Sequence, residues 1–80
     1  MGIAEAVRAR LYELLDERGL TINALSMLAG VTQSTANDFL KGTSSNIGII
    51  TLKKLIDGLD MTITEFFDDE IFRNLSQEMR

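Results

Sequence analysis

Residues 25–42, LSMLAGVTQSTANDFLKG, contain the pattern that decides the fold of this chain. A small-residue turn, AGV (29–31), separates two short runs in which apolar residues recur at helical spacing. The second run starts after Thr32, a residue type favoured at helix N-caps, and it ends at Gly42. Two short helices joined by a tight, glycine-bearing turn make a helix-turn-helix. The second helix also carries amide and hydroxyl side chains, so the next question is what they face.

Apolar periodicity on both sides of this stretch predicts three more helices. The first is expected over 3–18 and is ended by Gly19, because glycine enters the left-handed conformation without strain. The fourth is expected over 49–59, after a polar loop, and the chain then turns near Asp60, a residue type that tolerates the left-handed region. TITE (62–65) fits a capping box that opens a fifth helix, EFFDDEIF (65–72). The residues expected to face the core are Val7, Leu11, Leu14, Leu15, Ala24, Leu25, Leu28, Ala29, Ala36, Phe39, Leu40, Ile49, Leu52, Leu55, Ile56, Leu59 and Phe66.

The predicted fold is therefore all-α, with five helices and the helix-turn-helix at the second and third. We expect residues 1–68 to form this domain and residues 69–80 to form a C-terminal tail or an extension of the last helix. An apolar stripe that recurs every four residues runs into that segment, and such a stripe tends to seek burial. The alternative is that Phe66 and Phe67 complete the core while the rest frays. The candidate dimer contacts in the stripe are Phe67, Ile71, Phe72 and Leu75, with Met79 continuing the spacing.

Missing residue types exclude several kinds of site. The 80 residues include no Cys and no His, so disulfides, thiolate metal sites and a histidine general base are unavailable. Asp68, Asp69 and Glu70 are adjacent, but successive helical residues point in different directions and cannot act as an acid–base pair. We therefore expect no enzyme activity, no cofactor, no metal and no small-molecule ligand. No apolar run suggests a signal peptide or a membrane span, so a cytoplasmic location is expected.

The net charge of −4 argues at first against a nucleic-acid partner. Its distribution weakens that argument. Residues 1–60 carry six basic and seven acidic side chains, whereas residues 61–80 carry two basic and five acidic ones. The acidity is concentrated at the C-terminal end, so a face elsewhere can be close to neutral.

The helix-turn-helix places its second helix in the major groove of DNA, where side chains at the start of that helix contact base edges. Gln can bond adenine N6 and N7, and Ser or Thr can donate or accept at several bases. The segment GLTINALSMLAGVTQSTANDFLKGTSSNIGIITLKKLIDGLDMTITEFF (19–67) resembles the lambda-repressor-like, or XRE-type, helix-turn-helix domain of bacterial and phage regulators. The ordered set of motifs carries the resemblance, which covers about residues 5–68.

The resemblance implies double-stranded DNA as the partner and commonly a two-fold homodimer. Carried over by position, Gln33, Ser34 and Asp38 would face the bases. The residues implied at the edge of that face or against the DNA backbone are Thr21, Thr32, Thr35, Asn37, Lys41, Ser44, Ser45 and Asn46.

Five positions depart from the family pattern. Ile22 stands where a phosphate-binding Gln is frequent, and Asp38 puts a carboxylate where Arg or Gln is usual. Ser26 replaces a frequent Ala and needs a partner, such as a carbonyl one turn back. Ala36 stands where Ile or Val is usual, which thins the core beneath the recognition helix, and Ile47 replaces a common Pro. With few cations in the expected footprint, we predict weak non-specific DNA affinity.

The sequence thus favours a transcriptional regulator, most simply a repressor, that binds a specific DNA site. The rival hypothesis is a protein-interaction module, such as an antitoxin or an antagonist of a related regulator, that keeps the fold with little DNA binding. From residue types alone, Gln33, Ser34 and Thr35 could also be a solvated helix start. Lys53 and Lys54 are expected on the exposed face of the fourth helix.

Overall fold

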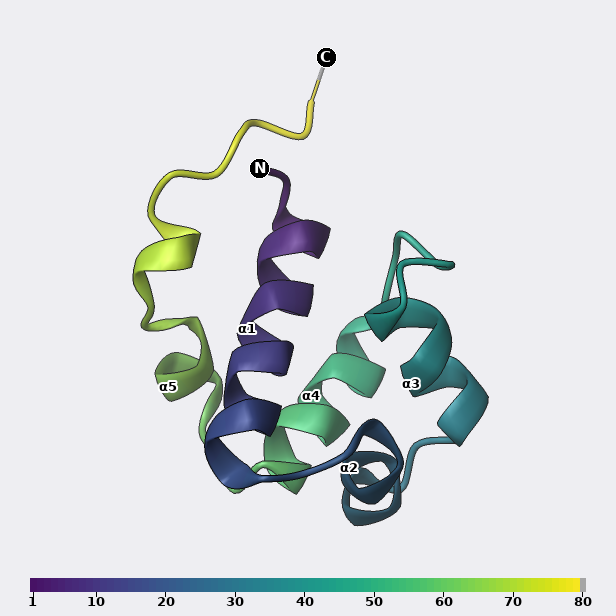
Figure 1. The fold of residues 1–80 in the computed structure, drawn as a ribbon. Helices are drawn as coiled ribbons and strands as arrows, with labels where there is room; N and C mark the ends of the chain where they lie inside the picture. The colour runs from purple at the N-terminus through teal and green to yellow at the C-terminus, as the bar shows by residue number, and fades with distance from the viewer. Residues whose placement is uncertain (80) are drawn as a thin grey trace.

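The computed structural model describes residues 1–79, and all regular structure in that range is helical. The predicted five-helix, all-α fold is confirmed. Figure 1 shows α1 standing between α5 and the C-terminal tail on one side and α4, α2 and α3 on the other. The elements are α1 (Ile3–Arg18), α2 (Ile22–Ala29), α3 (Gln33–Leu40), α4 (Ile49–Gly58), α5 (Ile63–Phe67) and a short 3-10 turn, η1 (Glu70–Phe72).

The ends of these helices are set by local chemistry that the sequence already contains. Gly30 ends α2 in the left-handed conformation at φ 69°, so the chain reverses there at no steric cost. Asp60 adopts φ 57° at the turn before α5, as predicted. The Thr62 hydroxyl accepts a hydrogen bond from the Glu65 N–H at 3.1 Å, while the Glu65 carboxylate accepts from the Thr62 N–H at 2.8 Å. The capping box is therefore present.

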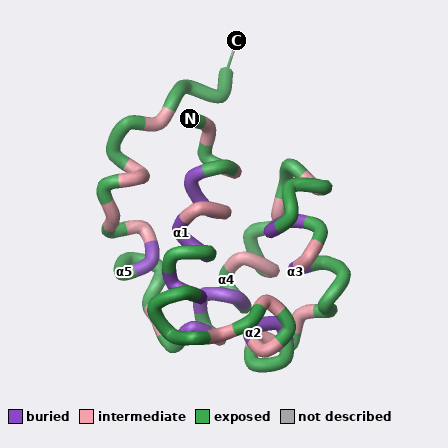
Figure 2. The backbone as a smooth tube through the Cα atoms, in the orientation of Figure 1, coloured by how far each residue is buried: buried purple, intermediate pink, exposed green. Residues whose placement is uncertain are grey.

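One contiguous core lies where α1, α2, α3, α4 and α5 meet, and Figure 2 shows the buried backbone positions gathered there. Two expected core residues are wrong: Leu28 is 62% exposed and Ile49 is 83% exposed. Leu28 is the penultimate residue of α2 and Ile49 is the first residue of α4, and apolar spacing alone does not show whether another element covers a helix end. The largest fully buried apolar side chains are Phe39, Phe66, Leu11, Leu25, Leu40, Leu55, Ile56 and Leu59.

A close approach between α2 and α4 fixes the helix-turn-helix on the rest of the domain. A Cβ atom added at Gly58 would stand 3.1 Å from both the Cβ and the backbone N of Ala29. Glycine at this position therefore lets the two helices pack more tightly than any other residue would. Ser26, buried on α2, donates from its hydroxyl to the Ile22 carbonyl at 2.9 Å, which is the partner expected one turn back.

The fifth helix is shorter than predicted, and the expected helix over 65–72 is wrong. It ends at Phe67, and η1 follows as a separate turn. The Arg10 guanidinium donates to the carbonyls of Glu65 and Phe66, at 3.2 and 2.9 Å, and these are acceptors that a continuing helix would need. The Asp69 carboxylate also accepts from the Ile71 N–H at 3.0 Å, which favours a local turn over a helix.

Residues 73–79 contain no helix, so the apolar stripe is not a helical face. Phe72 instead packs back against Phe66 and Phe67, with ring centroids 6.0 and 4.8 Å away, respectively. Leu75 is half-buried and Met79 is exposed. Of the segment predicted as tail or extension, residue 80 lies outside the described residues.

The tail returns along α1 to the N-terminus (Figure 1). The Ser76 N–H donates to the Met1 carbonyl at 3.0 Å, and the Ile3 N–H donates to the Glu78 carboxylate at 3.2 Å. The N-cap residue of α1 is Gly2, which has no side chain to accept from the first helical N–H groups. Glu78 thus supplies a carboxylate where an N-cap side chain would normally stand.

Candidate nucleic-acid interface

The two faces of α3 differ sharply. Ala36, Phe39 and Leu40 are buried and attach the helix to the core. Gln33 and Ser34, at the start of the helix, are exposed. Among the described residues, neither of these two side chains makes a hydrogen bond to the protein. The start of α3 thus presents an amide and a hydroxyl whose hydrogen-bonding groups are available to an external partner.

The neighbouring polar residues are partly engaged. The Asn37 amide donates to the Gln33 carbonyl at 2.8 Å and to the Asn23 side chain at 3.4 Å. The Thr32 hydroxyl accepts from the Thr35 N–H at 3.3 Å and donates to the Thr35 hydroxyl at 2.7 Å. Asn37 therefore links α3 to α2, whereas Thr32 and Thr35 shape the start of α3. Their exposed edges flank the amide and hydroxyl at the helix start.

The start of α2 lies beside this surface, since the Asn37–Asn23 contact joins the two helices. The Thr21 hydroxyl accepts from the Ala24 N–H at 3.0 Å and so serves as the N-cap of α2. The N-termini of two helices each present unpaired N–H groups and a positive dipole end, which suits phosphate oxygens. Ile22, half-buried, adds no donor side chain here.

The loop after α3 supplies the remaining predicted residues. Ser44 is half-buried, and its hydroxyl donates to the Asn46 carbonyl at 2.9 Å, so it orders the loop. Lys41, Ser45 and Asn46 are exposed. Lys41 ends α3, where the helix dipole is negative, and its side chain remains available to phosphate. Asp38 is exposed on the outer face of α3, and among the described residues its carboxylate has no ion-pair partner.

Two residues of α1 position this surface, and sequence reasoning missed both. Arg8 donates from Nε to the Phe39 carbonyl at 2.7 Å and from Nη2 to the Ser44 carbonyl at 3.2 Å. Its guanidinium carbon also lies 4.8 Å from the centre of the Phe39 ring. The Tyr12 hydroxyl donates to the Leu40 carbonyl at 2.7 Å. The four-residue spacing of Arg8 and Tyr12 places them on one helical face, but the sequence does not indicate which distant carbonyls they bond.

These contacts fix the end of α3 and the loop that follows it. The last carbonyls of a helix have no partner within the helix and need donors from elsewhere. The Arg8 guanidinium donates to one carbonyl in the last turn of α3 and to one in the loop, and it also opposes the negative end of the helix dipole. The exposed polar side chains of α3 therefore project from a helix that is held on its inner face and at its C-terminal end.

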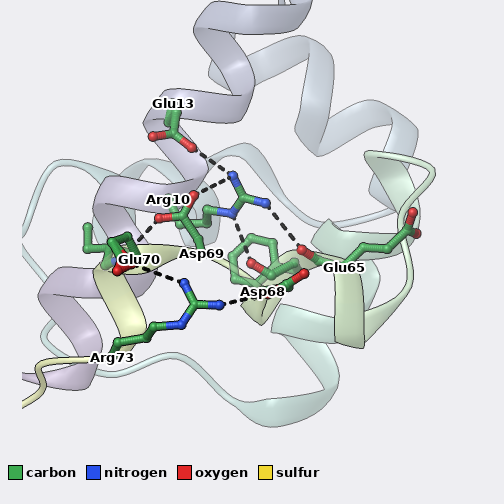
Figure 3. Close-up of polar contacts among 9 residues, drawn as sticks. Arg10, Glu13, Glu65, Asp68, Asp69, Glu70 and Arg73 are labelled. Atoms are coloured by element: carbon green, nitrogen blue, oxygen red, sulfur yellow. Dashed lines mark hydrogen bonds and ion pairs between the residues drawn. The ribbon is translucent and has the colours of Figure 1, made fainter.

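The acidic residues Asp68, Asp69 and Glu70 are paired with arginines (Figure 3), next to α5, which lies across α1 from α3 (Figure 1). Arg10 lies 3.2 Å from the Asp69 carboxylate and 2.7 Å from Glu13. Arg73 bonds Asp68 at 3.0 Å and Glu70 at 3.2 Å. The three adjacent acids thus serve in ion pairs within the protein, and these pairs lie away from α3.

Comparison with known proteins agrees with this geometry. Residues 10–70 match the model of the Cro/C1-type helix-turn-helix DNA-binding domain, and this covers more than half of the chain. This chain belongs to that family. The resemblance to lambda-repressor-like, XRE-type domains is confirmed, and with it the general class of DNA-binding helix-turn-helix proteins.

A solved structure, described as the prophage Lp1 protein 11, is similar over almost the whole length. It is 34% identical to this chain, covers 94% of it and 100% of its own chain, and superposes with a TM-score of 0.78. A comparison with curated protein sequences gives no match. Within residues 1–79, no helix combines the length and apolar character needed to cross a bilayer.

Proposed function

We propose that this protein is a transcriptional regulator, most simply a repressor, that reads a short double-stranded DNA site with α3 in the major groove. Gln33 and Ser34 would read base edges at the start of the helix, and Asp38 would accept from cytosine N4 further along. Two copies on a two-fold axis would place their α3 helices about one DNA turn apart, roughly 34 Å. Such a regulator would act in the cytoplasm, where bacterial and phage DNA is found.

One observation carries this proposal: the side chains of Gln33 and Ser34 are exposed and make no hydrogen bond among the described residues. They project from a helix whose opposite face is buried and whose C-terminal end is bonded by Arg8. A rigid scaffold with unengaged polar tips is what direct base readout needs, since the tips then meet the base edges at little entropic cost. The backbone contacts in this arrangement would come from Thr21, Thr32, Thr35, Asn37, Lys41, Ser44, Ser45 and Asn46.

The rival function, a protein-interaction module with little DNA binding, is favoured by a different observation. Lys41 is the one exposed cation within the predicted contact set, and two of the N–H donors of Arg8 bond carbonyl groups of the protein. Exposed Asp38 would repel phosphate. Because phosphate neutralisation supplies most non-specific affinity, this surface should bind mixed-sequence DNA weakly.

Binding to mixed-sequence duplex over a salt series separates the two functions. A DNA-binding protein should lose affinity as salt rises, with a shallow slope that reflects few phosphate contacts. No binding at about 50 mM salt, together with no enriched site after selection from random duplexes, would favour the interaction module.

The selected DNA site then tests whether Gln33 contacts a base. Gln33→Ala should lower affinity for that site by about 1–3 kcal/mol, and it should relax the preference at one base position. Gln77→Ala is the matched control, because it truncates the same residue type at an exposed position in the tail. Equal affinities for the two variants would remove Gln33 from the reading surface.

A further inference from the structure

A hollow of about 410 Å³ opens beside the N-terminal end of α1. It is lined by the first turns of α1, the loop after α3, the first turn of α4, the end of α5 and the tail. Its apolar part is formed by side chains that belong to the core or pack against it, namely Val7, Ile47, Leu52 and Phe67. Sites for small molecules are typically hollows of about 300–1,000 Å³ with mostly apolar walls. The size and the lining of this hollow therefore suit a small ligand.

A few polar groups border this apolar surface. Ser45 and Asn46 of the loop bring a hydroxyl and an amide, and Glu78 of the tail brings a carboxylate. All three residues are exposed, and among residues 1–79 the side chains of Ser45 and Asn46 make no hydrogen bond. A small number of polar groups around an apolar pocket is what orients a ligand in it. The hollow thus combines the apolar wall and the free polar groups that a specific ligand needs.

Backbone hydrogen bonds hold Glu78 in place at the hollow. The Ile3 N–H donates to Glu78 Oε2 at 3.2 Å, and the Ser76 N–H donates to the Met1 carbonyl at 3.0 Å. The other carboxylate oxygen, Oε1, makes no hydrogen bond within residues 1–79, and no cation in that range forms an ion pair with Glu78. One oxygen of a fixed carboxylate is therefore available to an occupant of the hollow.

This carboxylate decides which class of ligand fits. A molecule that fills the hollow displaces water from the side of Glu78 that faces it, and a charged group loses stability on drying unless a partner replaces the water. An anion would add repulsion and a hydrocarbon would replace nothing, whereas a cation compensates the loss. The Ser45 hydroxyl and the Asn46 side-chain oxygen are further acceptors. A primary ammonium group, which has several N–H donors, matches these acceptors.

We propose that the hollow binds a small amphipathic cation, with an alkyl or aryl body on the apolar surface and a primary ammonium group against Glu78. From the sequence we expected no small-molecule ligand, because the missing Cys and His exclude metal sites and catalysis. An apolar hollow depends on neither residue type. Its lining joins Ile3 to Glu78, 75 residues apart in the chain, so no local motif indicates it.

Three probes with the same chain length test the site: hexylammonium, hexan-1-ol and hexanoate. The amide signals of the full chain are followed by nitrogen–proton correlation NMR at neutral pH and constant ionic strength. Saturable shifts should be confined to the surroundings of the hollow, in residues 3–7, 45–52, 67 and 76–79. For a ligand of this size the Kd of hexylammonium should be about 1–10 mM. It should be about two- to fivefold lower than that of hexan-1-ol, and hexanoate should bind most weakly.

Two variants separate the carboxylate from the hollow itself. Glu78→Gln should lose the preference for hexylammonium over hexan-1-ol, because the amide keeps the size of the side chain and removes its charge. Ala4 lines the hollow, so Ala4→Leu should fill part of it and weaken binding of the two favoured probes at least about threefold. Glu17→Gln is the matched control: it neutralises an exposed acid at the other end of α1 and should keep the wild-type preference. Circular dichroism of each variant confirms that the fold is retained.

The proposal fails if no probe gives saturable shifts below about 50 mM, if Glu78→Gln keeps the preference for the ammonium, or if a folded Ala4→Leu protein binds as the wild type does. It also fails if the same amide signals shift on dilution of the protein alone, since a second copy would then be the occupant. None of these measurements involves DNA, so the proposed function is accepted or rejected separately.

Discussion

Two arginines, two residues apart on α1, hold the two sides of the molecule in different ways. Side chains at this spacing point to nearly opposite sides of a helix, about 200° apart. Arg8 reaches α3, and its hydrogen-bond acceptors among the described residues are all backbone carbonyls. Arg10 reaches α5 and bonds both backbone carbonyls and the carboxylates of Glu13 and Asp69. The acids on the α5 side are therefore held in ion pairs, whereas Arg8 on the α3 side has no carboxylate partner among the described residues.

This difference reconciles an acidic chain with a DNA-binding fold. Asp68, Asp69 and Glu70 are held in ion pairs with Arg10 and Arg73 (Figure 3), on the α5 side of α1. Arg8 bonds the end of α3 and the loop that follows, which the proposed function places against the DNA backbone. Net charge is thus a poor guide to partner here, because three of the twelve acids, Asp68, Asp69 and Glu70, are held in ion pairs away from α3.

Of the substitutions that test this difference between the two arginines, Arg10→Met should have the largest effect on stability. The change keeps an apolar stem but leaves the Asp69 carboxylate without its cation and the Phe66 carbonyl without the donor from Arg10. The free energy of unfolding should fall by about 2–4 kcal/mol, measured by urea denaturation at neutral pH. Lys54→Met, at an exposed position on α4, should stay within about 0.5 kcal/mol. An Arg10→Met protein as stable as this control would mean that the α5 side does not depend on the arginine.

Arg8→Met should have a smaller effect on stability and a larger one on DNA binding. Water can replace part of what Arg8 supplies to the Phe39 and Ser44 carbonyls, so the loss of unfolding free energy should be about 1–2 kcal/mol. The end of α3 and the loop would be less fixed, so affinity for the selected DNA site should fall more than in Arg10→Met. Tyr12→Phe, which removes the single bond to the Leu40 carbonyl, should cost about 0.5–1.5 kcal/mol.

Affinity is to be compared at a temperature where every variant is fully folded. Equal losses of DNA affinity for Arg8→Met and Arg10→Met would contradict the view that Arg8 positions α3 whereas Arg10 stabilises the α5 side.

Much of the fold was predictable because short-range chemistry determines it. The bounds of α1 came from apolar spacing and Gly19, and the turn at Asp60 and the capping box of Thr62 came from residue type. The partner of the Ser26 hydroxyl was predictable because it lies one turn back in the same helix. Helix starts and turns depend on residues that are close together in the sequence, so residue type predicts them.

The errors arose where distant segments decide the outcome. The end of α5 depends on Arg10, which is 56 residues from Phe66 in the chain. The clamp on α3 joins Arg8 to Phe39, 31 residues away. Leu28 and Ile49 have the right helical spacing, but periodicity does not tell whether a neighbour extends far enough to cover them.

The placement of the predicted DNA-reading residues stays a prediction, carried by family resemblance and by their exposure. The structure adds that the side chains of Asn37 and Ser44 bond carbonyl groups of the protein, whereas those of Gln33 and Ser34 make no hydrogen bond among the described residues.

The smallest expected effect is a difference in pH dependence between the start of α5 and the start of α3. The Thr62 N–H bonds the Glu65 carboxylate, and with the Thr62 hydroxyl it holds the pKa of Glu65 below its ordinary value. A lowered pKa means that the carboxylate stabilises the fold above the ordinary Glu value, about 4.3, and that this contribution is lost as pH falls through the folded-state pKa. The cap of α3 pairs Thr32 with Thr35 and contains no carboxylate, so it should add no such dependence.

Glu65→Gln should therefore be less stable than the wild type at pH 7, and the difference should shrink as the pH falls below about 4. Thermal denaturation of both proteins from pH 7 to pH 3 measures it. Thr35→Ala, which alters the start of α3, should instead give a stability difference that is the same at both ends of this range. A Glu65→Gln difference that did not change with pH would show that the carboxylate acts in the cap as a neutral acceptor would, and the two helix starts would then be equivalent.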